Sequence, residues 1–382
     1  MSKTVLVVFG TRPEAIKMAP LCNELKKNNK LFKTVICVTA QHREMLDQVL
    51  ELFDISPDED LNIMQHKQDL TDITSSILSS MRKIFNKYKP NLVLVHGDTT
   101  TTLAATLAAF YQNIPVGHVE AGLRTNNILA PFPEEFNRQV TSKIARLHFA
   151  PTQSSFENLL NEGISKDKIF VTGNTVIDAL KLVIEKIEND LAKKNKIEYF
   201  LNGILDFDLD KRFVLVTGHR RENFGDGFIN ICEALSALAK KFHDTHFVYP
   251  VHLNPNVQKP VKSILSSDKN IHLIDPLEYE PFIYLLRKSY MVLTDSGGIQ
   301  EEAPSIGKPV LVMRDVTERP EAVEAGTVKL VGANKKKIVT EVSFILENES
   351  EYNIMSDAHN PYGNGDTSKI IVDLIKRELN AN

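Results

Sequence analysis

Short apolar runs that alternate with longer helical stretches constrain the fold of this chain most strongly. The runs are rich in valine, isoleucine and leucine and lack polar alternation, which is typical of parallel strands buried on both faces of a sheet. The alternation occurs in two series, so the sequence predicts two doubly wound α/β domains. The expected strands are 5–9, 34–38, 92–95, 114–118, 147–150 and 169–172 in the first series, and 213–217, 245–250, 271–274, 291–294 and 309–313 in the second.

A polar segment separates the two series of strands. Residues 181–211 are rich in lysine, glutamate, asparagine and aspartate, a composition that predicts a solvated helix and a loop with no candidate for chemistry. We place the change of domain near Gly173 and Asn174, where a strand ends and a helix starting at Thr175 can cross to the second series. Two Rossmann-like domains with a cleft between them are the expected architecture, which by itself defines no function.

The overall charge and the cysteine pattern exclude several classes of protein. Among 382 residues, 45 are Lys or Arg and 49 are Asp or Glu, and the formal net charge of -4 argues against a nucleic-acid partner. Cys22, Cys37 and Cys232 are far apart and form no metal or redox motif, which favours a reducing compartment. The N-terminal run Val5–Phe9 is too short for a secretory signal, and no apolar stretch is long enough to span a membrane. We therefore expect a cytoplasmic protein with no membrane partner.

The segment Thr294–Ala303 contains the strongest signal for ligand binding. An apolar strand runs into Ser296, Gly297 and Gly298 and then into a helix, so backbone N–H groups and the positive end of the helix dipole should converge there. This arrangement predicts an anion site, with a diphosphate as the expected ligand, and Glu302 one turn later is well placed to bind ribose hydroxyls. The alternative is a tight turn that needs two glycines for backbone reasons alone.

A second strand-to-helix turn, Gly10–Lys17, opens the first helix of the chain. It lacks the G-x-G-x-x-G pattern, so a simple dinucleotide-binding site loses support. Arg12 and Lys17 are expected on the cleft side of this turn, where fixed positive charge could meet a phosphate. For Lys17 alone, a solvated helix cation is an equally good interpretation.

Three carboxylates follow strand ends in the first series: Asp98, Glu120 and Glu134. They should point into one crevice, because the carboxyl ends of parallel strands meet at one edge of a sheet. Mutual repulsion would spread their pKa values, as acid/base chemistry requires. Two structural alternatives stay open: Asp98 could cap the helix that begins near Thr99, and Glu134 could form an i,i+4 surface pair with Arg138.

A histidine and a cluster of cations follow the strand 213–217. His219 could donate to a leaving phosphate, although a lone histidine is more often structural. His252 is typical of a capped, turn-associated histidine rather than of a metal ligand. The sequence contains no H-E-x-x-H or comparable ligand spacing, so it implies no metal.

Several segments, highly specific as a set, identify a family. They are FGTRPEAIKMAP (9–20), HGDTTTT (96–102), HVEAGLRT (118–125), PFPEEFNRQ (131–139), GHRREN (218–223), YPVHLNP (249–255), DSGGIQEEAP (295–304) and RDVTERPEAVEAGT (314–327). Over nearly its whole length the chain resembles the non-hydrolysing UDP-N-acetylglucosamine 2-epimerases. The resemblance implies the two-Rossmann architecture shared with GT-B glycosyltransferases, with a C-terminal helix near 367–379 packed on the first domain. The domains would then be 1–173 with 365–382, which carries the acid/base residues, and 174–364, which binds UDP.

The resemblance implies interconversion of UDP-N-acetylglucosamine and UDP-N-acetylmannosamine, without a cofactor, for surface polysaccharide synthesis. In that family a base removes the C2 proton as UDP departs and 2-acetamidoglucal forms. Protonation from the opposite face and re-addition of UDP then invert C2. Asp98, Glu120 and Glu134 match the acid/base residues of the family. His219 matches the histidine that assists the leaving phosphate, and Arg12, Lys17 and Arg138 match the supporting cations.

The nucleotide-binding residues match in the same way. The turn Ser296–Gly298 resembles the diphosphate cradle, Glu302 the ribose contact and Arg319 a further cation of the cleft. Phe282 resembles the surface on which uracil stacks, and an ordinary core position is the alternative for this residue. Bacterial members also bind a second UDP-N-acetylglucosamine as an activator, and Lys67 stands where some relatives have arginine in that site. Gln41 and His42 match that site, whereas Lys67 departs from it.

Other functions stay open on the sequence. A GT-B glycosyltransferase would use the same UDP site but would need no C2 proton shuttle. A non-enzymatic nucleotide-sugar sensor would tolerate loss of Asp98 or Glu120. A hydrolysing epimerase would release free N-acetylmannosamine and UDP, and it usually accompanies a fused kinase domain in animals, for which this chain has no room. The family resemblance also implies a homodimer.

Closure of the two domains on a ligand is a further expectation, because the predicted site residues come from both domains. The radius of gyration measured by solution scattering should then be smaller with UDP than without it. An unchanged radius would contradict closure.

Overall fold

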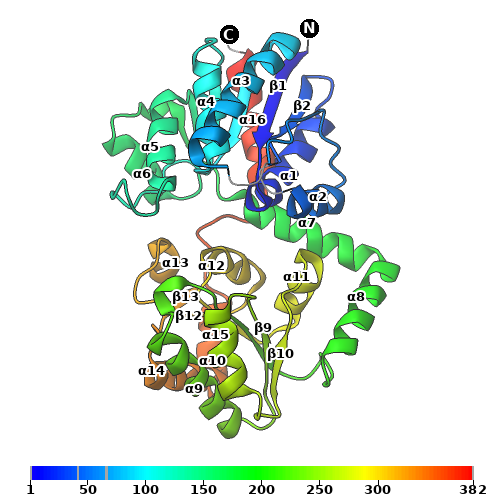
Figure 1. The fold of residues 1–382 in the computed structure, drawn as a ribbon, viewed down its shortest axis with the longest axis vertical. Helices are drawn as coiled ribbons and strands as arrows, with labels where there is room; N and C mark the ends of the chain where they lie inside the picture. The colour runs from blue at the N-terminus through cyan, green and yellow to red at the C-terminus, as the bar shows by residue number, and fades with distance from the viewer. Residues whose placement is uncertain (1, 41–42, 65–67, 381–382) are drawn as a thin grey trace. The chain divides into compact units, whose positions relative to one another are not determined.

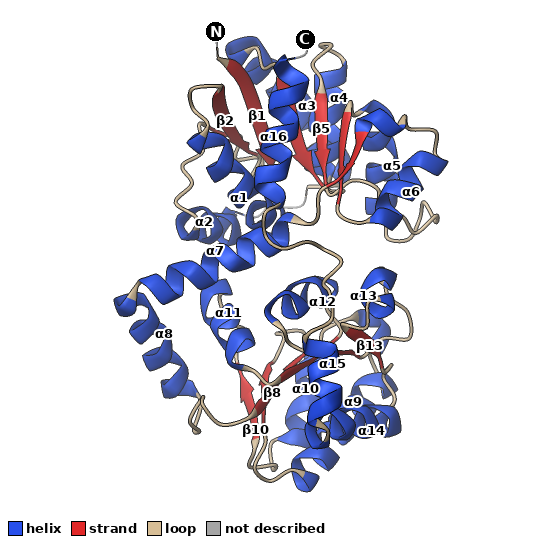
Figure 2. Ribbon diagram, turned by 180° about the vertical axis from the view of Figure 1, so that it is seen from behind, coloured by secondary structure: helices blue, strands red, loops and turns tan. Residues whose placement is uncertain are grey.

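The structure is a computed structural model. The residues that it describes are 2–40, 43–64 and 68–380. The chain divides into a first unit, Met1–Ala179 with Tyr362–Asn382, and a second unit, Leu180–Pro361. Each unit contains a parallel sheet covered by helices (Figures 1 and 2). The division falls inside helix α7 (Thr175–Asn189), whereas the sequence analysis places the change of domain just before this helix.

The first unit is built on a seven-stranded sheet in the order β3-β2-β1-β4-β5-β6-β7. The strand order reverses between β1 and β4, and in doubly wound sheets ligands bind at the carboxyl ends of the strands beside such a switch point. The strands are β1 (Lys3–Phe9), β2 (Phe32–Val38), β3 (Glu59–Asp60), β4 (Leu92–His96), β5 (Val116–Val119), β6 (Leu147–Ala150) and β7 (Ile169–Val171).

Helices cover both faces of this sheet. Leu6 and Val8 of β1 pack with Ile77 and Met81 of α3 in a buried core. The C-terminal helix α16 packs against α1, and Figure 1 shows this red segment within the same unit as the blue N-terminus. Besides α7, the helices are α1 (Arg12–Lys27), α2 (Arg43–Leu52), α3 (Leu70–Tyr88), α4 (Thr100–Phe110), α5 (Glu134–Ile144), α6 (Gln153–Asn161), a 3₁₀ turn (Lys166–Lys168) and α16 (Thr367–Asn380).

Gly10, between β1 and α1, is packed too closely to carry a side chain. A Cβ atom there would lie 2.0 Å from Thr39 Oγ1 and 2.5 Å from Thr101 Oγ1. These two hydroxyls form a buried hydrogen bond of 2.9 Å with each other. The turn that presents the first residues of α1 is therefore fixed by the absence of a side chain at Gly10.

Substitution of Gly10 by alanine should lower the free energy of unfolding by about 2 kcal/mol, because the two hydroxyls must move to admit the methyl group. Urea denaturation measures the loss. Gly203 is a matched control, since it lies in a helix and a Cβ atom there meets nothing within 4 Å. Gly203→Ala should stabilise the protein by up to about 1 kcal/mol. Equal effects of both substitutions would contradict the steric explanation.

The second unit contains a six-stranded parallel sheet in the order β10-β9-β8-β11-β12-β13. Its strands are β8 (Phe213–Thr217), β9 (His246–Pro250), β10 (Ile271–Ile274), β11 (Met291–Thr294), β12 (Val310–Val312) and β13 (Val328–Leu330). Its helices are α8 (Leu191–Ile204), α9 (Asp226–Lys241), α10 (Pro255–Leu265), α11 (Tyr279–Lys288), α12 (Gly297–Glu302), α13 (Pro320–Glu324), α14 (Lys335–Glu347) and α15 (Glu349–Ser356), with 3₁₀ turns at Arg221–Asn223 and Ala303–Ile306.

Every strand expected from the sequence is present, to within two residues at each end, which confirms two doubly wound α/β domains. The edge strands β3 and β13 were not predicted. The stretch 181–211, expected as a solvated helix and a loop, contains the end of α7, all of α8 and a loop that leads to β8, so it has two helices where one was expected. Within the described residues, no helix combines the length and the apolar character needed to cross a membrane.

Candidate active site

Two carboxylates of the first unit lie at the carboxyl ends of neighbouring strands. Asp98 follows β4, Glu120 follows β5, and these strands pair in parallel. The charges of Glu120, Lys17 and Glu134 all shift the pKa of Asp98, so each of these three side chains lies near Asp98. The predicted carboxylates of the first domain are therefore gathered at one edge of the sheet.

Asp98 is held by two residues of helix α5. Arg138 Nη2 lies 2.9 Å from Asp98 Oδ2, and Asn137 Nδ2 donates to the Asp98 carbonyl oxygen at 2.8 Å. Burial raises the pKa of the Asp98 carboxyl and outweighs the guanidinium of Arg138, which lowers it. Thr99 caps α4, since its hydroxyl accepts the N–H of Thr102. Thr99, and not Asp98, is therefore the cap, and the capping alternative for Asp98 is wrong. Because its pKa is raised, the Asp98 carboxyl holds a proton more readily than an exposed carboxyl.

Glu120 has a different electrostatic setting. Lys17 of α1 forms an ion pair with its carboxylate, and Asn174 Nδ2 donates to Oε2 at 2.8 Å. The ring of His96 lies 3.8 Å from the same oxygen, and burial lowers the pKa of His96 to about 4, so this ring is neutral near pH 7. A cation and an amide donor stabilise the ionised form of a carboxylate. The interpretation of Lys17 as a solvated cation is wrong, since its side chain is only 14% exposed.

His96 and Asn174 belong to this cluster although neither was predicted as a site residue. His96 is the last residue of β4, and Asn174 comes shortly after β7. The strand-end rule that identifies Asp98 could have identified both. The backbone of Glu120 has a φ of 61°, in the left-handed region that residues with side chains rarely adopt. Such strain is characteristic of functional sites, where surrounding contacts hold the residue in place.

Arg12 and Glu134 each begin a helix of the first unit. Arg12 opens α1 after the short turn that follows β1. Because β1 pairs with β4, Arg12 follows a strand next to that of Asp98. Glu134 is half-buried at the start of α5. Arg138 pairs with Asp98 and lies 3.5 Å from Glu135 Oε2, and among the described residues no ion pair joins it to Glu134. The surface-pair alternative for Glu134 is therefore wrong.

The turn Ser296–Gly298 begins helix α12 in the second unit, after β11. A Cβ atom on Gly297 would lie 3.3 Å from the guanidinium carbon of Arg319 and 3.6 Å from Arg220 Nη2. The hydroxyl of Ser296 does not cap the helix, so it does not compete for the first N–H groups. Two guanidinium groups and a helix start converge here, which is the donor set that a diphosphate requires.

Arg220 is the cation of this site that the sequence analysis did not select. It follows His219 in the loop after β8, and its Nε is buried with no hydrogen-bond partner among the described residues. Arg319, in contrast, pairs with Glu301 at 2.8 Å. The segment GHRREN signals several cations, but only the fold shows which guanidinium faces the Ser296–Gly298 turn.

Glu302 and Phe282 occupy neighbouring helices of the second unit. Glu302 ends α12, and Tyr279 Oη donates to its Oε1 at 2.8 Å. Tyr279 opens α11, the helix whose first turn also contains Phe282. Phe282 is half-buried and lies outside the buried core, so the core alternative loses support. Tyr279 is a further polar residue that sequence reasoning missed.

His219 is half-exposed in the loop after β8. Its ring stacks on that of His252, with centroids 5.5 Å apart. His252 Nδ1 accepts the N–H of Asn254 at 3.1 Å, which confirms the prediction of a turn-associated histidine. Burial lowers the pKa of His219, whereas the carboxylate of Asp295 raises it.

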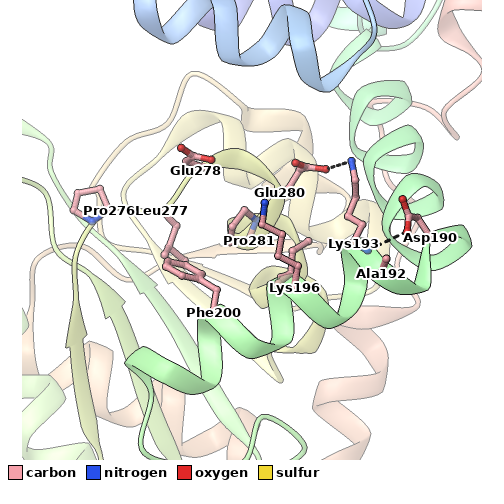
Figure 3. Close-up of a pocket in the computed structure, with 11 residues that line it drawn as sticks. Asp190, Ala192, Lys193, Lys196, Phe200, Pro276, Leu277, Glu278, Glu280 and Pro281 are labelled. Carbon is pink, nitrogen blue, oxygen red and sulfur yellow. Dashed lines mark hydrogen bonds and ion pairs between the residues drawn. The ribbon is translucent and has the colours of Figure 1, made fainter.

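A pocket of about 700 Å³ lies in the second unit between α8 and the segment that leads into α11 (Figure 3). Among the charged residues that line the pocket, Lys193 Nζ lies 2.7 Å from Glu280 Oε1, and the side chain of Asp190 caps α8. These three charged side chains therefore already have partners within the protein. The stretch 181–211 thus forms a pocket wall, although no candidate for chemistry was expected there. None of the predicted site residues that the structure describes lines this pocket. The lining residues are Asp190, Ala192, Lys193, Lys196, Ile197, Phe200, Pro276, Leu277, Glu278, Glu280 and Pro281.

The residues expected at the activator site, Gln41, His42 and Lys67, all lie outside the described residues. The elements on either side of the first two are β2 and α2. The role of these residues stays a prediction from the family resemblance.

Two doubly wound sheets, each with charged side chains at the carboxyl ends of its strands, define a GT-B-like α/β protein. A sequence profile of the UDP-N-acetylglucosamine 2-epimerase family matches residues 23–376, and the chain belongs to this family. The resemblance found in the sequence is confirmed, and the protein is an enzyme of the isomerase class.

Similar proteins match the chain over nearly its whole length. A UDP-N-acetylglucosamine 2-epimerase from Campylobacter jejuni is 58% identical over 381 residues, which are 100% of this chain and 99% of that protein. An enzyme of the same name from Escherichia coli K12 is 58% identical over 97% of this chain and 98% of its own length. The crystal structure of UDP-GlcNAc 2-epimerase from Neisseria meningitidis bound to UDP-GlcNAc has a TM-score of 0.88 and 56% identity, and covers 98% of this chain and 100% of that chain.

Proposed function

We propose that this enzyme interconverts UDP-N-acetylglucosamine and UDP-N-acetylmannosamine without net hydrolysis. The observation that carries the proposal is the pair of unlike carboxyls at adjacent strand ends. Burial raises the pKa of Asp98, whereas Lys17 and Asn174 surround the carboxylate of Glu120. Inversion at a carbon bearing a proton requires one group that accepts a proton and one that donates it, and these unlike surroundings suit the two carboxyls to the two roles. The similar enzyme from Neisseria meningitidis was crystallised with UDP-GlcNAc.

The first step of the proposed reaction is elimination. A carboxylate of the first unit takes the C2 proton, the C2–H electron pair forms the C1–C2 double bond of 2-acetamidoglucal, and the C1–O bond breaks with its electrons left on UDP. Glu120 is the base in one direction of the reaction. The developing charge on the diphosphate is stabilised by Arg220, Arg319 and the Ser296–Gly298 turn, with His219 as the proton donor.

The second step reverses the first on the opposite face of the sugar. A protonated carboxyl delivers its proton to C2 while a diphosphate oxygen of UDP re-forms the bond to C1. Asp98, which holds a proton more readily than an exposed carboxyl, is the donor in the same direction. Because the overall reaction is reversible, Asp98 and Glu120 exchange roles when the product reacts back. Arg138 and Glu134 act on the pKa of Asp98 in opposite directions, since the guanidinium lowers it and the Glu134 carboxylate raises it. Glu302 and Phe282 bind ribose and uracil.

The test of this function is turnover of UDP-N-acetylglucosamine in D₂O, followed by NMR at C2. UDP-N-acetylmannosamine that carries deuterium at C2 is the expected product. Free N-acetylmannosamine together with UDP would instead mean hydrolysis. Transfer of the sugar to an acceptor would indicate a glycosyltransferase. Binding of UDP with no turnover would indicate a sensor.

The cellular role proposed for the enzyme follows from the same family resemblance. It would act in the cytoplasm, as a homodimer, to supply a precursor of surface polysaccharide. Size-exclusion chromatography with light scattering tests the dimer, because a homodimer of this 43.0 kDa chain should elute at twice that mass. A monomer at micromolar concentration would contradict this part of the proposal.

A further inference from the structure

The fully buried side chain of Asp295 connects two parts of the second unit. Asp295 directly follows β11, and its Oδ2 accepts the backbone N–H groups of both His219 and Arg220 at 2.8 Å. The amide of Asn223 lies 3.4 Å from the same oxygen. One carboxylate oxygen therefore fixes the backbone of the loop that follows β8.

The second oxygen of Asp295 faces the ring of His219. Oδ1 lies 3.5 Å from His219 Nδ1 and is buried, and no hydrogen bond reaches it from any residue that the structure describes. A buried carboxylate oxygen without a donor is costly unless a partner can approach. The nearby ring nitrogen is the donor that this geometry offers, and a small rotation of the half-exposed ring would bring it within hydrogen-bond distance.

We propose that Asp295 is the positioning residue of His219, holding its ring with the proton on Nδ1 so that Nε2 is directed at the leaving diphosphate. The proposal rests on the function proposed above. In the elimination step the imidazolium gives its Nε2 proton to the departing phosphate oxygen and becomes neutral, with Nδ1–H still donated to Asp295 Oδ1. In the addition step the neutral ring takes that proton back. A carboxylate behind a histidine performs the same orienting role in other enzymes.

The groups around His219 make the charge of Asp295 important. His252 stacks on the ring, and Arg220 is the next residue in the loop. Tyr249 Oη donates to the carbonyl oxygen of Gly218 beneath the loop. Burial, His252 and Arg220 all lower the pKa of His219, and the Asp295 carboxylate raises it. The net pKa of His219 lies below its usual value even with this carboxylate, so loss of the carboxylate would lower the pKa further and leave less of the protonated ring that supplies the proton to the leaving group.

The first test needs no substitution. Nitrogen-15 chemical shifts of His219 in the full chain with bound UDP report which ring nitrogen carries the proton in the neutral form. The proposal expects the Nδ1–H form. Observation of the Nε2–H form would overturn it, whether or not the enzyme epimerises, so failure here is distinguishable from failure of the proposed function.

The second test is Asp295→Asn. The pKa of His219, measured by NMR with UDP bound, should fall by about one unit or more, since an amide supplies no negative charge. The value of kcat should fall by about 10-fold to 100-fold, and the alkaline limb of its pH profile, where His219 loses its proton, should move to lower pH. The Kd for UDP should change by less than about threefold. Asn223→Ala is the matched control, because it removes a contact to Asp295 but leaves its charge, and it should leave the pKa of His219 unchanged.

A double substitution separates positioning from a purely structural role. If Asp295 acts through His219, then Asp295→Asn should cost little further activity in the His219→Gln background. Two outcomes would overturn the proposal: an unchanged pKa of His219 in Asp295→Asn, or the same fold-loss of kcat from Asp295→Asn in both backgrounds.

Discussion

Replacement of Asp98 by asparagine should lower kcat by about 1000-fold and change the KM for UDP-N-acetylglucosamine by less than about threefold. Asparagine has nearly the same shape and can still meet Arg138, which lies 2.9 Å from the carboxylate in the native protein. It can neither hold nor release the proton that the reaction moves to and from C2. The loss therefore falls on the chemical step and leaves binding of the nucleotide almost intact.

The rate is measured by NMR as the conversion of UDP-N-acetylglucosamine to UDP-N-acetylmannosamine. Glu120→Gln should cause a loss of similar size, since the two carboxyls exchange roles between the directions of the reaction. Asp373→Asn serves as the control, because Asp373 is an aspartate of α16 in the same unit that pairs with Lys376 outside the proposed site. Asp98→Asn activity within tenfold of the native value would contradict an acid/base role for Asp98.

The central strands of both sheets could be predicted from sequence because their burial on two faces leaves continuous apolar runs. Val5–Phe9 and Val214–Val216, for example, are fully buried. The edge strands give no such signal. Strand β3 consists of Glu59 and Asp60, and β13 contains Lys329, since charged residues are common on strands that no partner covers on one side. Their pairing depends on the neighbouring strand rather than on their own composition.

The candidate site was predictable where a residue follows a strand that the sequence reveals. Asp98, Glu120 and the Ser296–Gly298 turn are of this kind. Contacts between distant segments were not predictable in this way. Asn174 reaches Glu120 from a strand end that is 54 positions away, and the pairing of Tyr279 with Glu302 depends on how α11 and α12 pack. Sequence spacing shows which residue types are present, whereas the fold determines which of them meet.

Acidification from pH 7 to pH 5 should destabilise the first unit by about 6 kcal/mol through three buried histidines, each of which contributes about 2 kcal/mol. His96, His118 and His148 lie on the neighbouring strands β4, β5 and β6, and all are buried. Burial lowers their pKa values to about 4, about 3 and about 4, respectively. In the unfolded chain a histidine titrates near pH ~6.5, so below that pH the unfolded state binds protons that the folded state does not. The stability is present above pH ~6.5 and is lost as the pH falls toward the folded values.

The variant His148→Leu isolates this effect from the other titrating groups. Burial raises the pKa values of Glu14 and Asp178, which opposes the histidines on acidification, but these carboxyls are common to both proteins. Between pH 7 and pH 5 the variant should therefore lose about 2 kcal/mol less unfolding free energy than the native protein, measured by urea denaturation. His243→Leu, at an exposed position, should lose as much as the native protein. Equal losses in all three proteins would mean that His148 is protonated as readily in the folded state as in the unfolded chain.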